Sequence, residues 1–179
     1  MRLADVNTGD LASAVRLGCH AMGAAYDATT GDGPRFEASL APDPVLVFHP
    51  WFSEAHVPGR HLVALLAAER SLGLAVDESL IDRNQQALWR AFSGPVAFPL
   101  NREVPGGPDV NFLPHNLREG LGGLAALIEH RGSEHARELA MACVRDIRRS
   151  WAPETGWHEP APVPAGSMGT TPGSELVAG

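Results

Sequence analysis

Two stretches of the chain, residues 49–61 and 101–119, concentrate side chains that can titrate, donate hydrogen bonds or stack on a ligand. They are His49, Trp51, His56, Arg60, His61, Asn101, Arg102, Asp109, Asn111, His115, Asn116, Arg118 and Glu119. Tryptophan and histidine in a loop stay exposed to solvent unless something uses or covers them. We therefore predict that the two stretches form one ligand-binding site. The alternative for each residue is that its side chain only packs a loop against the helix ends.

Carboxylates are the candidates for acid–base chemistry within this set. On a helix, His115, Arg118 and Glu119 share a face, because they are spaced by three and four residues. A carboxylate that faces an arginine and a histidine near a cleft is suited to act as a general acid or base. We predict Glu119 and Asp109 as catalytic residues. The competing interpretation of Glu119 is an ordinary surface pairing with His115.

The basic residues indicate the charge of the ligand. All fourteen are arginines, so mechanisms that need a lysine are excluded. Arg60, Arg102 and Arg118 fall in the two stretches although the chain has a net charge of −7. A guanidinium binds a carboxylate through two hydrogen bonds, which favours an anionic ligand such as a uronate sugar. The competing interpretation is that these arginines pair with carboxylates nearby, namely Glu54, Glu103 and Glu119.

Metal, phosphate and serine-hydrolase sites lack their motifs in this sequence. His49, His56 and His61 follow one another at seven and five residues, which matches no recognised zinc pattern. A metal-dependent hydrolase built on these histidines and His115 would need three of the four imidazoles to converge on one point. No GxSxG and no GxxxxGK[ST] motif is present. We predict neither a metal nor a cofactor.

Five amphipathic helices are expected to position the two stretches, because apolar side chains repeat every three or four residues in five segments. The segments run from about residue 10 to 26, 60 to 72, 77 to 93, 114 to 131 and 133 to 151. Their boundaries are marked by the capping residues Asp77, Ser133, Gly73 and Gly132. Leu11 and Leu72 lie on the apolar stripes of the first two helices. Short strands are expected at residues 35–40 and 45–48.

The lengths of the connections predict the topology. Residues 73–76 and 131–132 are short connections, so the second and third helices, and the fourth and fifth, form two antiparallel hairpins. Residues 27–57 and 93–113 are long, and long loops are often functional. Because the third helix returns to the end where the second began, both long loops should meet there. The opposite end, with its tight turns, is expected to carry no functional site.

Composition places the chain among globular proteins and excludes some partners. It has 179 residues, 44% of them apolar, with 14 basic and 21 acidic side chains. The absence of basic clusters argues against nucleic acid, and the absence of a long apolar run or a signal sequence predicts a cytoplasmic protein without a membrane partner. Cys19 and Cys143 are expected to be small core residues. We predict one domain over residues 1–157 and a disordered tail over residues 158–179, which is rich in proline and glycine.

Three stretches of the sequence resemble those of a known superfamily. They are HPWFSEAHVPGRHLVALLAAE (residues 49–69), GPVAFPLNREVPGGPDVNFLPHNLREGLGGLAALIEHRG (residues 94–132) and SWAPETGW (residues 150–157). These stretches resemble bacterial proteins of the six-hairpin glycosidase-like superfamily, and the resemblance covers residues 10–157. It implies an (α/α)6 toroid whose loop-rich end binds carbohydrate, with glycoside hydrolases, lyases and epimerases among the relatives.

The resemblance also implies that the chain is incomplete, because such a toroid needs twelve helices and five are expected here. We therefore expect an all-α partial toroid from a truncated carbohydrate-active enzyme that is inactive alone. Its unpaired helix faces would favour self-association. The alternative is a helical module that binds a protein partner without catalysis. A polar pocket at the loop-rich end would favour the enzyme, and exposed apolar helix faces would favour the module.

Overall fold

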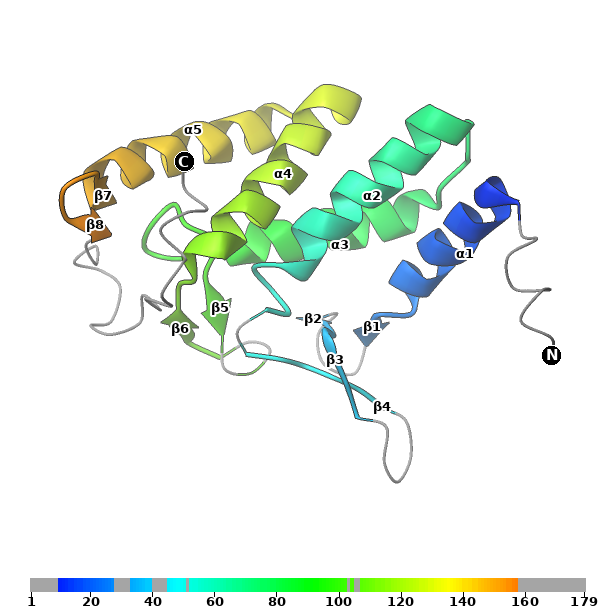
Figure 1. Ribbon diagram of the computed structural model, residues 1–179, viewed down its shortest axis with the longest axis horizontal. Coiled ribbons are helices and arrows are strands. Elements are labelled where there is room, and N and C mark those ends of the chain that lie inside the picture. Colours follow the sequence, from blue (N-terminus) through cyan, green and yellow to red (C-terminus); the bar gives the residue numbers. More distant parts are fainter. Residues whose placement is uncertain are drawn as a thin grey trace.

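The computed structural model describes residues 10–27, 33–39, 45–50, 52–102, 104 and 107–157 (Figure 1). Helices make up most of this part, which confirms the predicted helical class. The five helices are α1 (Leu11–Gly23), α2 (Val57–Leu72), α3 (Glu78–Ala91), α4 (Pro114–Arg131) and α5 (Glu134–Ser150). The tail predicted for residues 158–179 lies outside the described residues. No helix within the described ranges is long and apolar enough to cross a membrane.

The helices begin and end at the predicted capping residues. The Asp77 carboxylate accepts a hydrogen bond from the Ser79 backbone N–H at 2.9 Å and so caps α3. Gly73 and Gly132 end α2 and α4 in the left-handed conformation, with φ of 60° and 62°. Helix α2 begins at Val57, slightly before the predicted start, because proline is well tolerated in the first turn of a helix.

Four two-stranded antiparallel sheets complete the described structure. The pairs are β1 (Tyr26–Asp27) with β2 (Gly33–Pro34), β3 (Glu37–Ser39) with β4 (Val45–Val47), β5 (Asn101–Arg102) with β6 (Asp109–Asn111), and β7 (Trp151–Ala152) with β8 (Gly156–Trp157). The β3–β4 pair confirms the strands expected at residues 35–40 and 45–48. The other three pairs were not expected, because strands of two or three residues leave no alternating pattern in a sequence.

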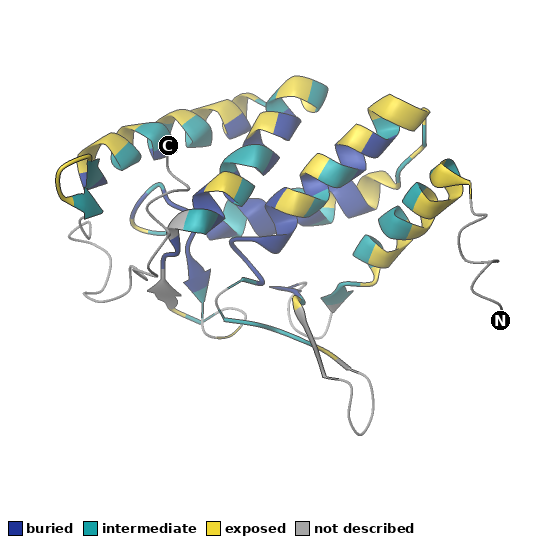
Figure 2. Ribbon diagram, viewed as in Figure 1, coloured by how far each residue is buried: buried dark blue, intermediate teal, exposed yellow. Residues whose placement is uncertain are grey.

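The core lies where the two helical hairpins, α2–α3 and α4–α5, meet, with α2 packed against α4 (Figure 2). Its fully buried large apolar side chains are Leu62, Leu65, Leu66, Ile81, Leu88, Phe98, Phe112, Leu124 and Leu127. Cys143 is also buried, as predicted, and burial raises the pKa of its thiol to about 12. Cys19 is only partly buried, at the edge of this core.

Two apolar residues of the predicted stripes do not reach the core. Leu11 is 74% exposed, and no residue of α1 is fully buried, because α1 packs only along the edge of α2 and α3. Leu72 is 39% exposed, because it is the last residue of α2 and precedes the turn at Gly73. The predicted apolar stripes of α1 and α2 therefore extend beyond the part of each helix that the core covers.

Helices α2 and α4 approach each other closely through glycines. A Cβ added to Gly59 would lie 2.0 Å from the carbonyl oxygen of Glu119, and one added to Gly123 would lie 2.7 Å from the Cα of Gly59. Neither position therefore has room for a larger residue. This contact brings the first turn of α2 against the second turn of α4, and it sets the distance between the side chains that these turns carry.

Ion pairs join the helices at the end with the tight turns. The Arg131 guanidinium, at the end of α4, lies 2.7 Å from the Glu69 carboxylate of α2 and 3.0 Å from the Glu78 carboxylate of α3. Arg70 of α2 also pairs with Glu129 of α4. The two tight turns therefore lie at one end, as predicted, and the long loops lie at the other (Figure 1).

Candidate functional site

Buried polar contacts hold the two long loops together. The Glu54 carboxylate, which is 3% exposed, accepts hydrogen bonds from the backbone N–H of Arg102 at 3.1 Å and from its Nε at 2.9 Å, and it also contacts Nη2. The fully buried Asn101 accepts a hydrogen bond from the backbone N–H of Ala55 at 3.1 Å. Arg102 therefore shows the ion pairing that was its alternative interpretation. Both residues act here as supports of the loops.

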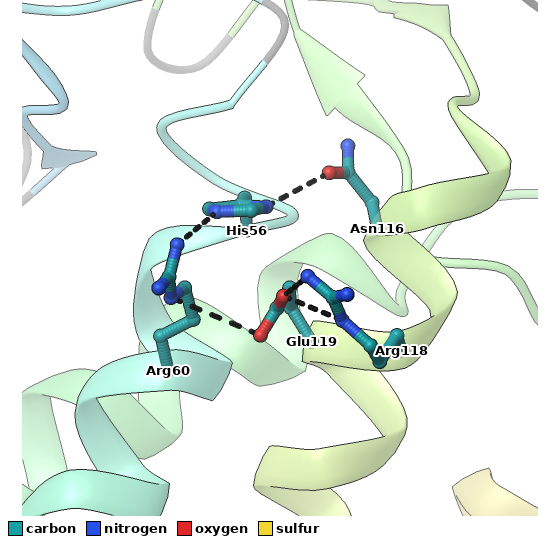
Figure 3. Close-up of polar contacts among 5 residues, drawn as sticks. All are labelled: His56, Arg60, Asn116, Arg118 and Glu119. Atoms are coloured by element: carbon teal, nitrogen blue, oxygen red, sulfur yellow. Dashed lines mark hydrogen bonds and ion pairs between the residues drawn. The ribbon is translucent and has the colours of Figure 1, made fainter. Parts of the chain in front are cut away.

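His56 links α2 to α4 through both nitrogens of its ring. Its Nε2 lies 3.1 Å from Nη1 of Arg60, and its Nδ1 lies 3.3 Å from Oδ1 of the buried Asn116 (Figure 3). A guanidinium only donates, so Nε2 accepts and Nδ1 carries the proton that is donated to Asn116. Burial lowers the pKa of His56; the charge of Glu119 opposes this shift and the charge of Arg60 adds to it, and the net lowering favours this neutral form.

Glu119 lies between two arginines on the adjoining face of α4. Its carboxylate contacts Nη2 of Arg118 and accepts a hydrogen bond from Nε of the same residue at 2.9 Å. Its other oxygen lies 3.9 Å from Nε of Arg60 (Figure 3). The Glu119 side chain is 13% exposed, whereas Arg60 is 58% exposed. Glu119 thus forms ion pairs with Arg60 and Arg118, which is the competing interpretation given above for these two arginines.

Aromatic and imidazole rings pack around this polar centre. The ring centroid of Phe52 lies 4.9 Å from that of His49, 5.7 Å from that of His56 and 5.4 Å from that of His115. Burial lowers the pKa of His115, and the charge of Arg118 adds to this effect. Within the described ranges, no three His, Cys, Asp or Glu residues gather in a way that could hold a metal ion. The three converging imidazoles that a metal-dependent hydrolase would need are thus not formed there.

A hollow of about 240 Å³ opens beside these rings. Its walls come from α2 and from the segment between β2 and β3, and they include Arg35, Phe36, His56, Arg60 and His61. Sequence reasoning missed Arg35 and Phe36, although they begin one of the segments expected to form a short strand. Their part in the hollow depends on how the β3–β4 hairpin folds back, which no local pattern encodes.

His61 is a half-buried ionisable residue in the wall of this hollow. Burial lowers the pKa of His61 to about 4, so the ring is neutral at physiological pH, and a hydrogen bond with the Asn84 side chain opposes part of this shift. Asn84 is itself fully buried and accepts a hydrogen bond from the Tyr26 hydroxyl at 2.5 Å. Among the described residues, Nδ1 of His61 has no hydrogen-bond partner.

The remaining predicted residues are placed less fully. Trp51 lies outside the described residues. Asp109 and Asn111 form β6, where they pair with Arg102 and Asn101 of β5, but their side chains are not among those described. The structure therefore brings His49, His56, Arg60, His61, His115, Asn116, Arg118 and Glu119 together, and it uses Asn101 and Arg102 to hold the loops.

Comparisons of the chain with protein-family models, with curated proteins and with solved structures gave no match. The resemblance to the six-hairpin glycosidase-like superfamily therefore stays a prediction.

Proposed function

We propose that this chain forms the sugar-binding part of a carbohydrate-active enzyme of the α/α toroid type, and that its loop-rich end binds a sugar with a carboxylate group. One observation carries the proposal: Arg60 lines the hollow and also lies within ion-pairing distance of Glu119. A single guanidinium thus connects a binding hollow to a candidate acid or base.

The walls of the hollow supply the contacts that a sugar acid requires. Arg60 provides a guanidinium for a carboxylate, and Arg35, whose Nη1 donates to the Leu46 carbonyl at 2.9 Å, adds a second positive charge to the wall. Phe36 offers a ring face for the apolar side of a sugar, and Nδ1 of the neutral His61, which has no partner among the described residues, offers a hydrogen bond to a hydroxyl group. The volume of about 240 Å³ is below the range of about 300–1,000 Å³ that is usual for ligand pockets, which suits a single sugar unit.

Glu119 is the proposed acid or base, and a ligand bound to Arg60 would change the ion pairs of the Glu119 carboxylate. The separation of 3.9 Å between Arg60 and Glu119 exceeds hydrogen-bonding distance. A ligand carboxylate on Arg60 would compete for this guanidinium and would leave Glu119 paired with Arg118 alone. The carboxylate oxygen released from Arg60 would then be available for proton transfer.

Glycoside hydrolysis by the usual mechanisms requires a second carboxylate. Glu54 is unsuited, because both of its oxygens contact Arg102 in a buried pair. Asp109 remains the candidate from the sequence. We therefore propose that the described residues bind the sugar, and that hydrolysis depends on a carboxylate in addition to those that the structure describes.

Calorimetric titration with D-glucuronate and D-glucose tests the binding. These sugars share a ring, and only glucuronate carries a carboxylate. We expect glucuronate to bind more tightly than glucose and to weaken about tenfold in Arg60→Gln, since one charge-assisted hydrogen bond contributes about 1.5 kcal/mol or more. Arg145→Gln, on the exposed face of α5, is the matched control and should bind glucuronate as the unaltered chain does. Equal affinity for the two sugars, or no effect of Arg60→Gln, would refute the proposal.

A second candidate function, a helical module that binds proteins, is favoured by the apolar side chains on the outside of the helices. Leu17, Val63 and Met141 are 69%, 44% and 55% exposed. Sedimentation velocity at increasing protein concentration separates the two candidates. Association that Val63→Ser and Met141→Ser abolish, together with an absence of glucuronate binding, would favour the module.

A further inference from the structure

A larger cavity, of about 510 Å³, lies away from the candidate site, between α1 and the connection that joins α2 to α3. Its walls come from the second half of α1, from residues 74–77 and from the start of α3. This cavity adjoins one of the tight turns, at the end of the fold that was expected to carry no functional site. The cavity was not expected there, because that prediction did not consider where α1 would pack.

Positive side chains dominate the ionised groups of this cavity. Arg16 of α1 and Arg83 of α3 both line it, and among its described lining residues Asp77 is the one carboxylate. Asp77 caps α3 through its hydrogen bond with Ser79, and its charge also interacts with that of Arg83. The Arg83 guanidinium lies 5.7 Å from the ring centroid of Tyr26, and this cation–π contact holds it in place. Two guanidinium groups against one carboxylate give the lining a net positive charge, which favours an anionic ligand.

The remaining walls are largely apolar. Leu74 and Val76 come from the connection between α2 and α3, and Leu80 comes from the first turn of α3. Apolar surface beside two guanidinium groups matches a ligand that has a charged head and a hydrocarbon body. The volume lies within the range of about 300–1,000 Å³ that is usual for pockets that hold small organic molecules.

We propose that this cavity binds a medium-chain carboxylate, with the carboxylate paired to Arg16 and Arg83 and the hydrocarbon chain packed against Leu74, Val76 and Leu80. This ligand site is separate from the loop-rich end and does not depend on the function proposed for that end.

The chain contains its own reporter for the test. Cys19 lines the cavity and is partly exposed, whereas Cys143, the other cysteine, is fully buried. Alkylation by iodoacetamide should therefore modify Cys19 much faster than Cys143, which peptide mass spectrometry resolves. We expect octanoate at millimolar concentration to slow the alkylation of Cys19 at least fivefold. Octanamide, which has the same chain without the charge, should protect Cys19 much less.

Arg16→Gln is the decisive variant, because Arg16 is exposed and its replacement should leave the fold intact. We expect this variant to require about tenfold more octanoate for the same protection, and Arg145→Gln to require no more than the unaltered chain. Calorimetric titration with octanoate measures the same binding without a thiol. The proposal is overturned if octanoate neither protects Cys19 nor gives a heat of binding. It is also overturned if octanamide protects equally or if Arg16→Gln has no effect.

Discussion

Replacing Gly59 with alanine tests whether α2 and α4 need the close contact between their main chains. The added Cβ would lie 2.0 Å from the carbonyl oxygen of Glu119 and 2.6 Å from its carbonyl carbon, whereas ordinary contact begins at 3.4 Å. Both atoms belong to the main chain of α4, so no change of rotamer relieves the overlap. The two helices must separate, and the packing of Leu62 and Leu124 in the core must loosen.

Two opposing effects set the magnitude of this change. Alanine is favoured over glycine inside a helix by about 1 kcal/mol. Overpacking of a close contact costs about 1–3 kcal/mol, and the overlap here falls at the upper end because it involves main-chain atoms. We therefore expect Gly59→Ala to lower the free energy of unfolding by about 2 kcal/mol. For a chain of this size, that corresponds to a fall of about 4–8 °C in Tm.

Urea unfolding followed by circular dichroism measures this difference, and α4 provides a matched control. A Cβ added to Gly122 would lie 3.6 Å from Cγ2 of Val63, which is an ordinary contact. Gly122→Ala should therefore raise the free energy of unfolding by up to about 1 kcal/mol. If Gly59→Ala were as stabilising as Gly122→Ala, the glycine contact would not limit the approach of the helices, and the reasoning would be refuted.

Three further predictions concern buried and paired charges. Burial lowers the pKa of His61 in the folded state to about 4 from 6.5. The stability that the neutral ring contributes is therefore complete above pH 6.5, and the free energy of unfolding falls by about 3 kcal/mol as the pH falls towards 4. Urea unfolding at both ends of this range should show a smaller loss for His61→Gln, and an equal loss would contradict the prediction. Glu54→Ala leaves Arg102 without its buried partner and should cost about 3 kcal/mol in the same assay, so a cost below about 1 kcal/mol would argue against the pair. Arg131→Met should cost about 0.5–1 kcal/mol at low salt and little at high salt, and a cost independent of salt would show that packing is responsible.

The helices and their order could be predicted from the sequence because their signals are local. Asp77 and Ser133 start helices, and Gly73 and Gly132 end them, so the boundaries follow from side-chain caps and from backbone conformation. The meeting of the two long loops followed from the antiparallel hairpins. The buried pair of Glu54 and Arg102 confirms this meeting.

The geometry of the site could not be predicted, because it depends on distances between elements. The sequence left His115 and the nearby arginines open as partners of Glu119, and the approach of α2 to α4 at the glycine contact places Arg60 within 3.9 Å of the carboxylate. The apolar stripe of α1 predicted the helix, but periodicity does not reveal whether a partner surface is large enough to cover Leu11. The cavity between α1 and residues 74–77 was not predicted either, because periodicity does not show where α1 packs.

The close contact between α2 and α4 also has a consequence for the order of folding. The hairpins α2–α3 and α4–α5 each join neighbours in the sequence, whereas Gly59 meets Gly123 across more than sixty residues. Contacts between neighbours in the sequence form faster than contacts between distant segments, so we expect each hairpin to form before the two dock. His56 and Arg60 belong to the first hairpin, and Asn116 and Glu119 belong to the second. The contacts between the two halves of the site therefore form only at docking, and an intermediate with both hairpins formed would have most of the helix and none of these contacts.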